Sequence, residues 1–346
     1  MGFKRLEADD FVVSAQAQTS TCWTNSQPTL TTFFTSSTQV NGSVSSKYYI
    51  SVFNENPTGS NSSAQFEIAY GNENGGGSLA FNQTAAPGVS PASTIFGQYR
   101  TLVLEDENSG FVFGGVSGSS FYVLSIERSA YKESLFPGSL NLILSSSLSN
   151  GAGTELRLTD DSGMVNIPTY YGAMRAYQVI SGSNGKSYNS GSGGTGYTTP
   201  SGSYGLFLPD IGTILLNGDA LDLNDAEGLN LSTVTSSNTN GENPLKLLQS
   251  MQSGSSFKLN SEETITSDFV FVRARNSEFN YSENPSYISG STGEVIYDYF
   301  INNPQTYLTT VGLYNDSNEL IAAAKLSKPL NKDFTKEALI RVKLDF

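Results

Sequence analysis

The chain has 346 residues, long enough for two or three domains or for one large β assembly. Hydrophobic residues make up 37% of it and include 20 Phe and 18 Tyr, which is enough core material to exclude global disorder. The net charge of −13, without any cluster of Lys and Arg, argues against nucleic acid as a partner and indicates a solvated acidic surface.

Histidine is absent, which removes Ser-His-Asp and Cys-His catalysis and nearly every zinc or non-haem iron site. Cys22 is the only cysteine, so no internal disulfide can form, and beside Trp23 we expect a small packed thiol. Charged residues are only 15%, whereas Ser, Thr, Asn and Gly are abundant, and this balance favours strands and turns over surface helices. We therefore expect a mainly β fold of antiparallel sandwich- or barrel-like domains with long polar loops and one or two short helices.

The first residues contain no recognisable targeting signal. Residues 1–15 lack a long apolar segment, and Leu6 stands where a myristoylation pattern after Gly2 needs Ser or Thr. No run approaches the roughly 18 apolar residues needed to span a bilayer. We therefore expect a protein that is made in a cytoplasm and has no membrane partner.

The first predicted segment, residues 1–95, is a polar arm followed by a β region. Residues 16–46 are dominated by Ser, Thr, Gln and Asn. Residues 47–53 and 64–70 are β-prone runs and predict two strands. The three glycines at 75–77 predict a loop, because glycine holds regular structure only at a high entropic cost.

The second predicted segment, residues 96–230, is a central antiparallel β domain. Short β-rich runs bounded by turn residues recur through it, and this spacing favours a sandwich or barrel over a βαβ arrangement. The Gly/Ser-rich stretch 181–203 is too poor in apolar residues to fold by itself, so we expect a long exposed loop there. The predicted strands are residues 98–104, 111–116, 121–127, 139–144, 154–159, 173–180, 204–208 and 211–216.

The third predicted segment, residues 231–346, is a short helix followed by a C-terminal β domain. Asn243 as N-cap, Pro244 at the first helical position and Gly254 as a stop predict the helix. Residues 268–275 then return to the alternation of a strand.

A hairpin and a terminal strand are predicted at the C-terminal end of this segment. Residues 306–314 and 319–326 are β-prone and are separated by four residues of turn-forming Asn, Asp and Ser. A linker containing Pro329 is expected next. Apolar and polar residues then alternate over residues 340–346, as in a half-buried strand. The residues on its apolar face are Ile340, Val342, Leu344 and Phe346.

Three groups of neighbouring carboxylates lie in turn-like contexts, where solvated acids are the usual case. A glycosidase needs two carboxylates that face each other across a cleft, one of them with a pKa raised by burial. We therefore expect surface acids and no catalytic residue. The groups are Glu105-Asp106-Glu107, Asp160-Asp161 and Glu262-Glu263.

Three short patterns match cofactor or metal motifs by letter only. Residues 191–196 have the glycine spacing of a dinucleotide fingerprint, but no strand precedes them and no helix follows. Residues 185–187 resemble the end of a phosphate-binding loop, but Ile180 stands where its first glycine is needed. Residues 222–227 begin like a calcium loop and then lack the ligands and the glycine. We expect no cofactor and no bound metal.

Aromatic residues near the C-terminal end are the candidate interface residues. Phe279, Tyr281 and Tyr287 would be the candidates for a glycan-binding surface on this polar scaffold. We favour packing of a local turn or a subunit contact instead, since aromatic enrichment also marks protein interfaces. Tyr307 and Phe346 complete the set.

Four blocks of the sequence are distinctive as strings. They are IERSAYK with PGSLNL (residues 126–132 and 137–142), YGLFLPDIGTILLNGDALDL (204–223), FVRARNSEFNYSENPSYI (271–288), and the C-terminal hairpin and strand. Together they resemble virion structural proteins of large contractile-tailed bacteriophages of the T4-like and cyanophage type, in particular a baseplate wedge component.

This resemblance implies a non-enzymatic structural subunit of a phage tail or baseplate, located in the virion. Its expected partners are further copies of itself and other tail or baseplate proteins, paired through edge strands and extended arms. Two alternatives remain open. A receptor- or glycan-binding tail-fibre or spike protein would need an exposed aromatic groove, and a carboxylate-dependent depolymerase would need two acids about 5–10 Å apart across a cleft.

Overall fold

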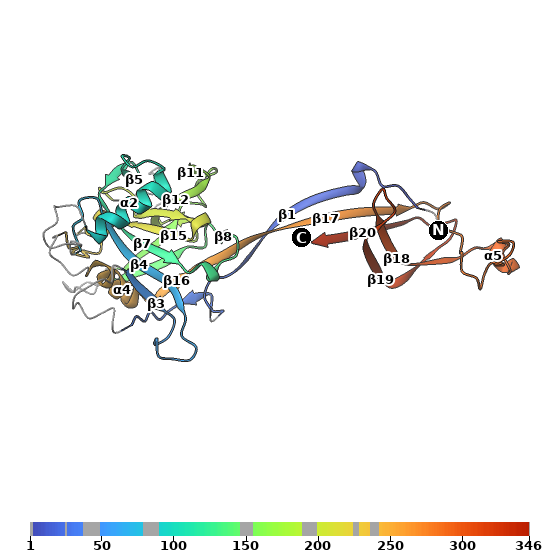
Figure 1. Cartoon of the computed structure of the whole chain (residues 1–346), viewed down its shortest axis with the longest axis horizontal. Coiled ribbons are helices and arrows are strands. Elements are labelled where there is room, and N and C mark those ends of the chain that lie inside the picture. The colour runs from blue at the N-terminus through green and yellow to red at the C-terminus, as the bar shows by residue number, and fades with distance from the viewer. Residues whose placement is uncertain are drawn as a thin grey trace. The chain divides into compact units, whose positions relative to one another are not determined.

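A computed structural model of the chain describes residues 3–24, 26–36, 49–78, 90–145, 155–188, 199–223, 228–235 and 242–345. The described residues are mainly β-strand, arranged in antiparallel sheets with a few short helices, as the composition predicts (Figure 1).

The chain forms two compact units. The larger unit is Gln18–Glu263, and the smaller unit combines Met1–Ala17 with Thr264–Phe346. The three segments expected from the sequence divide the chain differently. The two ends of the chain belong to one unit because the N-terminal strand pairs with a strand that is far away in sequence, and sequence patterns do not report such long-range pairing.

The larger unit is built on one long antiparallel sheet. Its strand order is β2-β16-β9-β10-β12-β14-β15-β7-β4-β3, and β11 and β13 pair with β12 beside this path. The strands are β2 (Thr29–Leu30), β3 (Tyr49–Phe53), β4 (Ala64–Asn72), β7 (Ser120–Ile126), β9 (Asn141–Ser145), β10 (Glu155–Asp160), β11 (Thr169–Tyr171), β12 (Met174–Ser183), β13 (Lys186–Ser187), β14 (Gly205–Leu208), β15 (Thr213–Asn217) and β16 (Ser256–Lys258).

Both faces of this sheet carry apolar cores. Along β7, Tyr122 and Leu124 join the main core, while Phe121 and Val123 join a second core on the opposite face. This alternation follows from the pleat of a strand, which sends successive side chains to opposite faces. The second core is completed by helix α2 (Pro91–Leu104) and the main core by helix α4 (Asn243–Gly254).

The strand predicted at residues 98–104 is wrong, because these residues form the second half of helix α2. Ser90 caps the helix by accepting a hydrogen bond from the Ser93 amide at 3.3 Å, and Pro91 occupies the first helical turn. Phe96 and Val103, seven residues apart on one helix face, are both buried in the second core. Tertiary packing and this cap therefore outweigh the β-prone side chains of the segment.

Helix α4 is confirmed, but its N-cap is Glu242 rather than Asn243. The Asn243 side chain is instead used by the preceding loop, where its Oδ1 accepts from the Val234 amide at 2.8 Å and its Nδ2 donates to the Val234 carbonyl at 2.9 Å. Gly254 ends the helix as expected, and Ser255 follows it in the left-handed conformation at φ 49°.

The remaining predicted strands of the larger unit are confirmed to within a few residues, except that the run 111–116 is a small hairpin. Gly114 and Gly115 take positive φ angles of 57° and 92° and turn the chain between its two strands. The two strands of this hairpin are β5 (Phe111–Phe113) and β6 (Val116–Gly118). The other short elements are β8 (Ser134–Leu135), α3 (Gly218–Leu221), and the 3₁₀ turns η1 (Ala8–Asp10), η2 (Arg128–Ala130) and η3 (Pro209–Ile211).

The smaller unit contains a narrow sheet and a separate two-stranded ribbon. The sheet has the order β1-β17-β20, formed by β1 (Phe11–Thr21), β17 (Asn260–Ala274) and β20 (Ala338–Asp345). The ribbon pairs β18 (Thr306–Tyr314) with β19 (Leu320–Lys332), and the short helix α5 (Asp298–Asn302) lies just before it in the chain. Strands β1 and β17 each begin in one unit and end in the other.

The predicted C-terminal hairpin is confirmed, but Pro329 lies inside β19 and not in a linker. The pairing of the two strands shifts between Leu308 opposite Leu330 and Thr310 opposite Lys325. Pro329 falls in the unpaired stretch that this irregularity creates, where a missing N–H breaks no ladder bond.

The terminal strand is confirmed as β20. Val342 lies opposite Val270, and both are buried. Ile340 lies opposite Val272. Leu344 is half-buried on the same face, whereas Phe346 lies outside the described residues.

Candidate assembly surface

Many apolar side chains of the smaller unit are exposed. We call these residues the assembly surface. They are Phe11, Val12 and Val13 on β1; Tyr307, Tyr314, Leu320, Ile321 and Leu330 on the β18–β19 ribbon; and Ile296, Tyr297, Tyr299 and Ile301 around α5. Apolar side chains that gather in contiguous exposed patches, as opposed to scattered single residues, mark sites where proteins bind one another.

Strand β1 is open on both of its faces. Ten of its eleven residues are exposed, and only the last is half-buried. Phe11 and Val13 point to one face and Val12 to the other, with exposed fractions of 48%, 69% and 48%. The strand also forms one edge of its sheet, so its outer row of backbone N–H and C=O groups is available for pairing.

The β18–β19 ribbon likewise has apolar residues on both faces. Tyr307 and Tyr314 are exposed, whereas Leu308 and Leu313, each next to one of these tyrosines in the strand, are half-buried. Ile321 on the partner strand is 69% exposed. An isolated two-stranded hairpin is marginally stable in water, so a ribbon of this length needs a partner surface.

The base of the ribbon is fixed by a buried lysine. Lys332 is fully buried, and its ammonium group donates to the Asn276 carbonyl at 2.9 Å, to Asn280 Oδ1 at 2.9 Å and to the Asp333 carbonyl at 3.0 Å. All three donors of the ammonium group therefore find acceptors, which offsets the cost of burying the charge. Thr306, at the start of β18, adds a 2.7 Å hydrogen bond to the Phe279 carbonyl.

The candidate aromatic residues divide into packed and exposed members. Tyr287 lies between the rings of Tyr297 and Phe300, at centroid distances of 6.0 and 5.3 Å, and so packs the local turn. Phe279 is half-buried in a left-handed conformation at φ 57°. Tyr281 is 53% exposed and its hydroxyl reaches the Gly293 carbonyl at 3.5 Å.

Tyr307 is 61% exposed on the ribbon and belongs to the assembly surface, whereas Phe346 lies outside the described residues. Sequence reasoning missed the exposed residues of β1. The signal was present, because Phe11-Val12-Val13 is an apolar run without the alternation of a half-buried strand.

The expectation of solvated acids is wrong for Asp160 and Asp161, which are buried. Both Asp160 oxygens accept from the Gly138 amide at 2.9 Å, and Asp161 Oδ1 accepts from the Gln178 amide at 3.0 Å. Burial raises the pKa of Asp160 even though the Ser162 and Gly138 amides hydrogen-bond its charged form. Both carboxylates hold the backbone of neighbouring turns and strands together, a role that turn-like sequence does not reveal.

The other acidic groups behave differently. Glu105, at the end of α2, is exposed together with Asp106 and Glu107, as expected. Glu262 and Glu263 are only half-buried and form ion pairs with Arg175 and Lys132, so they are occupied structurally.

A central ion pair joins β12 to the turn before β15. Arg175 donates through Nε and Nη2 to Asp210 Oδ1 at 2.9 and 2.7 Å, and its own amide binds Asp210 Oδ2 at 2.7 Å. Arg175 also donates to Ser134 Oγ at 3.0 Å and lies 3.7 Å from Glu262. Desolvation, which lowers the pKa of the Arg175 guanidinium, is outweighed by Asp210 and Glu262, so its pKa is raised.

The motif-like strings have structural explanations or lie outside the described residues. Asn184 and Gly185, with φ 52° and 76°, form a two-residue turn between β12 and β13, which accounts for the glycine before Lys186. Asp222 accepts hydrogen bonds from Thr233, while residues 224–227 and 189–198 lie outside the described residues.

Neither a metal-binding cluster nor a membrane-spanning helix occurs among the described residues. No group of three His, Cys, Asp or Glu side chains in this part of the chain could hold a metal ion. None of the helices in the described ranges is both long and apolar enough to cross a membrane.

Comparison with known proteins adds no relative from which a role could be transferred. No family model, no curated protein and no solved structure matches this chain.

Proposed function

We propose that this protein is a non-enzymatic structural subunit of a bacteriophage tail or baseplate, which assembles through β-rich surfaces with copies of itself and with other virion proteins. The observation that carries the assembly role is the exposure of apolar side chains on both faces of β1 and along the β18–β19 ribbon. Fully burying one Val, Ile or Phe side chain contributes roughly 1.5–3 kcal/mol, so covering this surface would strongly favour association.

The virion setting is supported by the sequence resemblance. Two of its four blocks, residues 271–288 and the C-terminal hairpin and strand, lie in the smaller unit that carries the assembly surface. Extended edge strands pair readily with neighbouring chains through backbone hydrogen bonds, which is a common means of building repeated assemblies.

Self-assembly is tested by light scattering of the purified full chain over a dilution series. We expect species larger than the 37.0 kDa single chain at micromolar concentration, with dissociation on dilution. A monomer at every concentration would contradict self-assembly. The virion role is tested separately, by locating the chain in electron-microscopy maps of intact tailed particles and by mass spectrometry of their baseplates. Its absence from the particle would contradict that part of the proposal.

A further inference from the structure

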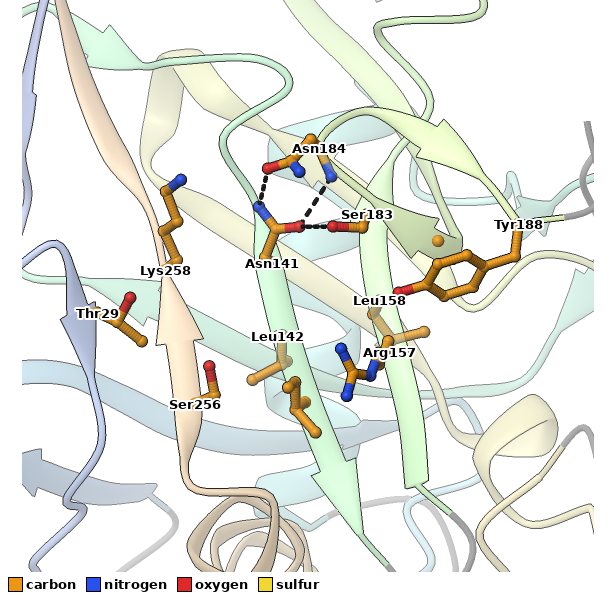
Figure 2. Close-up of a pocket in the computed structure, with 12 residues that line it drawn as sticks. Thr29, Asn141, Leu142, Arg157, Leu158, Ser183, Asn184, Tyr188, Ser256 and Lys258 are labelled. Carbon is orange, nitrogen blue, oxygen red and sulfur yellow. Dashed lines mark hydrogen bonds between the residues drawn. The ribbon is translucent and has the colours of Figure 1, made fainter.

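A pocket of about 220 Å³, lined by both polar and apolar residues, lies on the larger unit, on the side of β16, β9 and β10 that faces away from the main core (Figure 2). Leu142, Leu158 and Phe257 point into that core, so the residues alternating with them point outward. The register places Lys258 opposite Asn141, and Arg157 opposite Ile143, on this outer side. The pocket is therefore built on a rigid sheet and not on loops alone.

One wall of the pocket is the tight β12–β13 hairpin. A side chain at Gly182 would place its Cβ 2.1 Å from the Lys186 carbonyl oxygen, so only glycine lets β13 fold back here. Asn141 holds this wall in place. Its Oδ1 accepts from the Asn184 amide at 2.8 Å and from Ser183 Oγ at 2.9 Å, and its Nδ2 donates to Asn184 Oδ1 at 3.2 Å (Figure 2).

The charge of the pocket is opposite to that of the whole chain. Arg157 and Lys258 line it, and no Asp or Glu is among its lining residues, although the chain carries a net charge of −13. Arg157 Nε is paired with Glu155 at 2.5 Å outside the lining, a hydrogen bond that raises the pKa of the guanidinium. The Lys258 ammonium group has no hydrogen-bond or ion-pair partner among the described residues.

Further polar groups of the lining are also free to bind a ligand. Within the described ranges, the hydroxyls of Thr29 and Ser256 and the Nδ2 of Asn184 have no hydrogen-bond partner. Figure 2 shows the Tyr188 ring at the edge of the pocket, with its hydroxyl directed toward Arg157. Tyr188 is 56% exposed, so its ring offers a flat apolar face beside the cations.

From these groups we propose that the pocket binds one oxyanion-bearing sugar residue, with the oxyanion between Arg157 and Lys258 and the sugar ring against Tyr188. Charge-assisted hydrogen bonds from Arg and Lys are the strong contacts to a carboxylate or phosphate group. A bare inorganic anion would use only the two cations and would leave the hydroxyls, the amide and the aromatic face without a role. The volume is below the roughly 300–1,000 Å³ of pockets for drug-sized ligands, which suits a single sugar ring.

Register explains how two cations on different strands can share one anion. Arg157 and Lys258 are two strands and two residues apart, which places their Cα atoms about 12 Å from each other in a regular sheet. Arg and Lys side chains are long enough to reach one anion across this distance, and Asn141 lies on the strand between them.

The test is calorimetric or NMR titration of the full chain with glucuronate, glucose 6-phosphate, neutral glucose and inorganic sulfate. We expect one of the two acidic sugars to bind, weakening as salt is added, while glucose and sulfate bind at least tenfold more weakly. Binding of glucuronate would identify a carboxylated sugar as the ligand, and binding of glucose 6-phosphate a phosphorylated one. Equal affinity for sulfate would overturn the sugar part of the proposal, and no binding of either acidic sugar would overturn all of it.

Variants locate the site. Lys258→Gln and Arg157→Gln should each reduce the affinity about tenfold or more. Lys186→Gln removes an exposed cation on the neighbouring hairpin that does not line the pocket, and should change the affinity less than twofold. An equal loss in all three variants would show a general charge effect and overturn the pocket. Tyr188→Ala should weaken the binding of the sugar and leave the weak binding of sulfate unchanged. If the binding of the sugar stayed the same, the sugar ring would not stack on Tyr188.

Discussion

The buried ammonium group of Lys332 donates a 2.9 Å hydrogen bond to Oδ1 of Asn280, 52 residues earlier in the chain. This contact ties the end of β19 to the loop that follows β17. The three hydrogen-bond acceptors of the ammonium group are uncharged, so complete hydrogen bonding offsets the cost of burying its charge.

Replacing this lysine should loosen the ribbon. Lys332→Met leaves the Asn280 oxygen and two carbonyls without their donor, at about 1–3 kcal/mol for a buried unsatisfied group. We expect a loss of about 2–4 kcal/mol in the free energy of unfolding of the smaller unit, measured by hydrogen exchange of the ribbon amides. Lys325→Met, on an exposed position of the same strand, is the matched control and should change it by less than about 0.5 kcal/mol. Equal effects of the two variants would contradict the role of Lys332.

The stability that the Arg175–Asp210 pair contributes should depend on the shape of the guanidinium group and not only on its charge. Arg175→Lys keeps the charge but loses the two-pronged contact with Asp210 and the bond to Ser134. We expect a loss of about 1–3 kcal/mol in stability to urea. Arg273→Lys, which alters an exposed pair with Glu337, should cost less than about 1 kcal/mol. A similar cost for both would show that the two-pronged geometry contributes little.

Much of the fold could be predicted from the sequence because a half-buried strand leaves a period-two pattern. The C-terminal hairpin and β20 were found in this way, since Ile340 and Val342 alternate with charged residues. Helix α2 was missed because its Thr-Leu-Val-Leu ending is β-prone, although Ser90 and Pro91 gave a helix-start signal. Local propensity here conflicted with the cap, and burial of Phe96 decided the outcome.

The candidate sites were less predictable because they depend on contacts between distant residues. The pocket combines Thr29, Asn141, Arg157, Gly182 and Lys258, which no local pattern brings together. The aromatic candidates were found by composition, but composition does not tell a packed ring from an exposed one. The buried Asp160-Asp161 pair was mistaken for a surface turn for the same reason, since burial is a property of the packed fold.

Asp333 should titrate well below an ordinary aspartate. Hydrogen bonds from Thr335 and then Lys336 lower its pKa to about 2. Because the folded-state pKa is below the unfolded value, this carboxylate stabilises the fold at higher pH. Its contribution is present above the unfolded pKa of about 4 and is lost as the pH falls toward 2. We expect a carbon-13 NMR titration of its carboxyl carbon to show a midpoint of about 2.

The matched variant for this titration is Asp333→Asn. It should flatten the loss of stability between about pH 4 and pH 2 relative to the natural chain. An Asp333 midpoint near 4 would contradict the hydrogen-bonded arrangement.

Cys22 should be unreactive in the folded chain. It is 2% exposed, and burial raises the pKa of its thiol to about 12, so almost no thiolate is present at neutral pH. We expect no reaction with a thiol reagent such as a disulfide dye at pH 8 over hours, and full reaction of one thiol per chain in denaturant. Rapid labelling of the folded chain would show that the region around Trp23 opens readily.

Assembly should depend on single apolar residues of the smaller unit. Ile321 and Ile167 are exposed to similar extents, 69% and 77%, but only Ile321 belongs to the assembly surface, whereas Ile167 lies on the larger unit. Ile321→Ser should weaken self-association about tenfold or more, because it removes roughly 1.5–3 kcal/mol of apolar burial. Ile167→Ser should leave the dissociation constant unchanged in the same light-scattering series. If both substitutions weakened association equally, self-association would depend on exposed apolar residues in general and not on the assembly surface. If neither weakened it, the ribbon would not be part of the contact between copies.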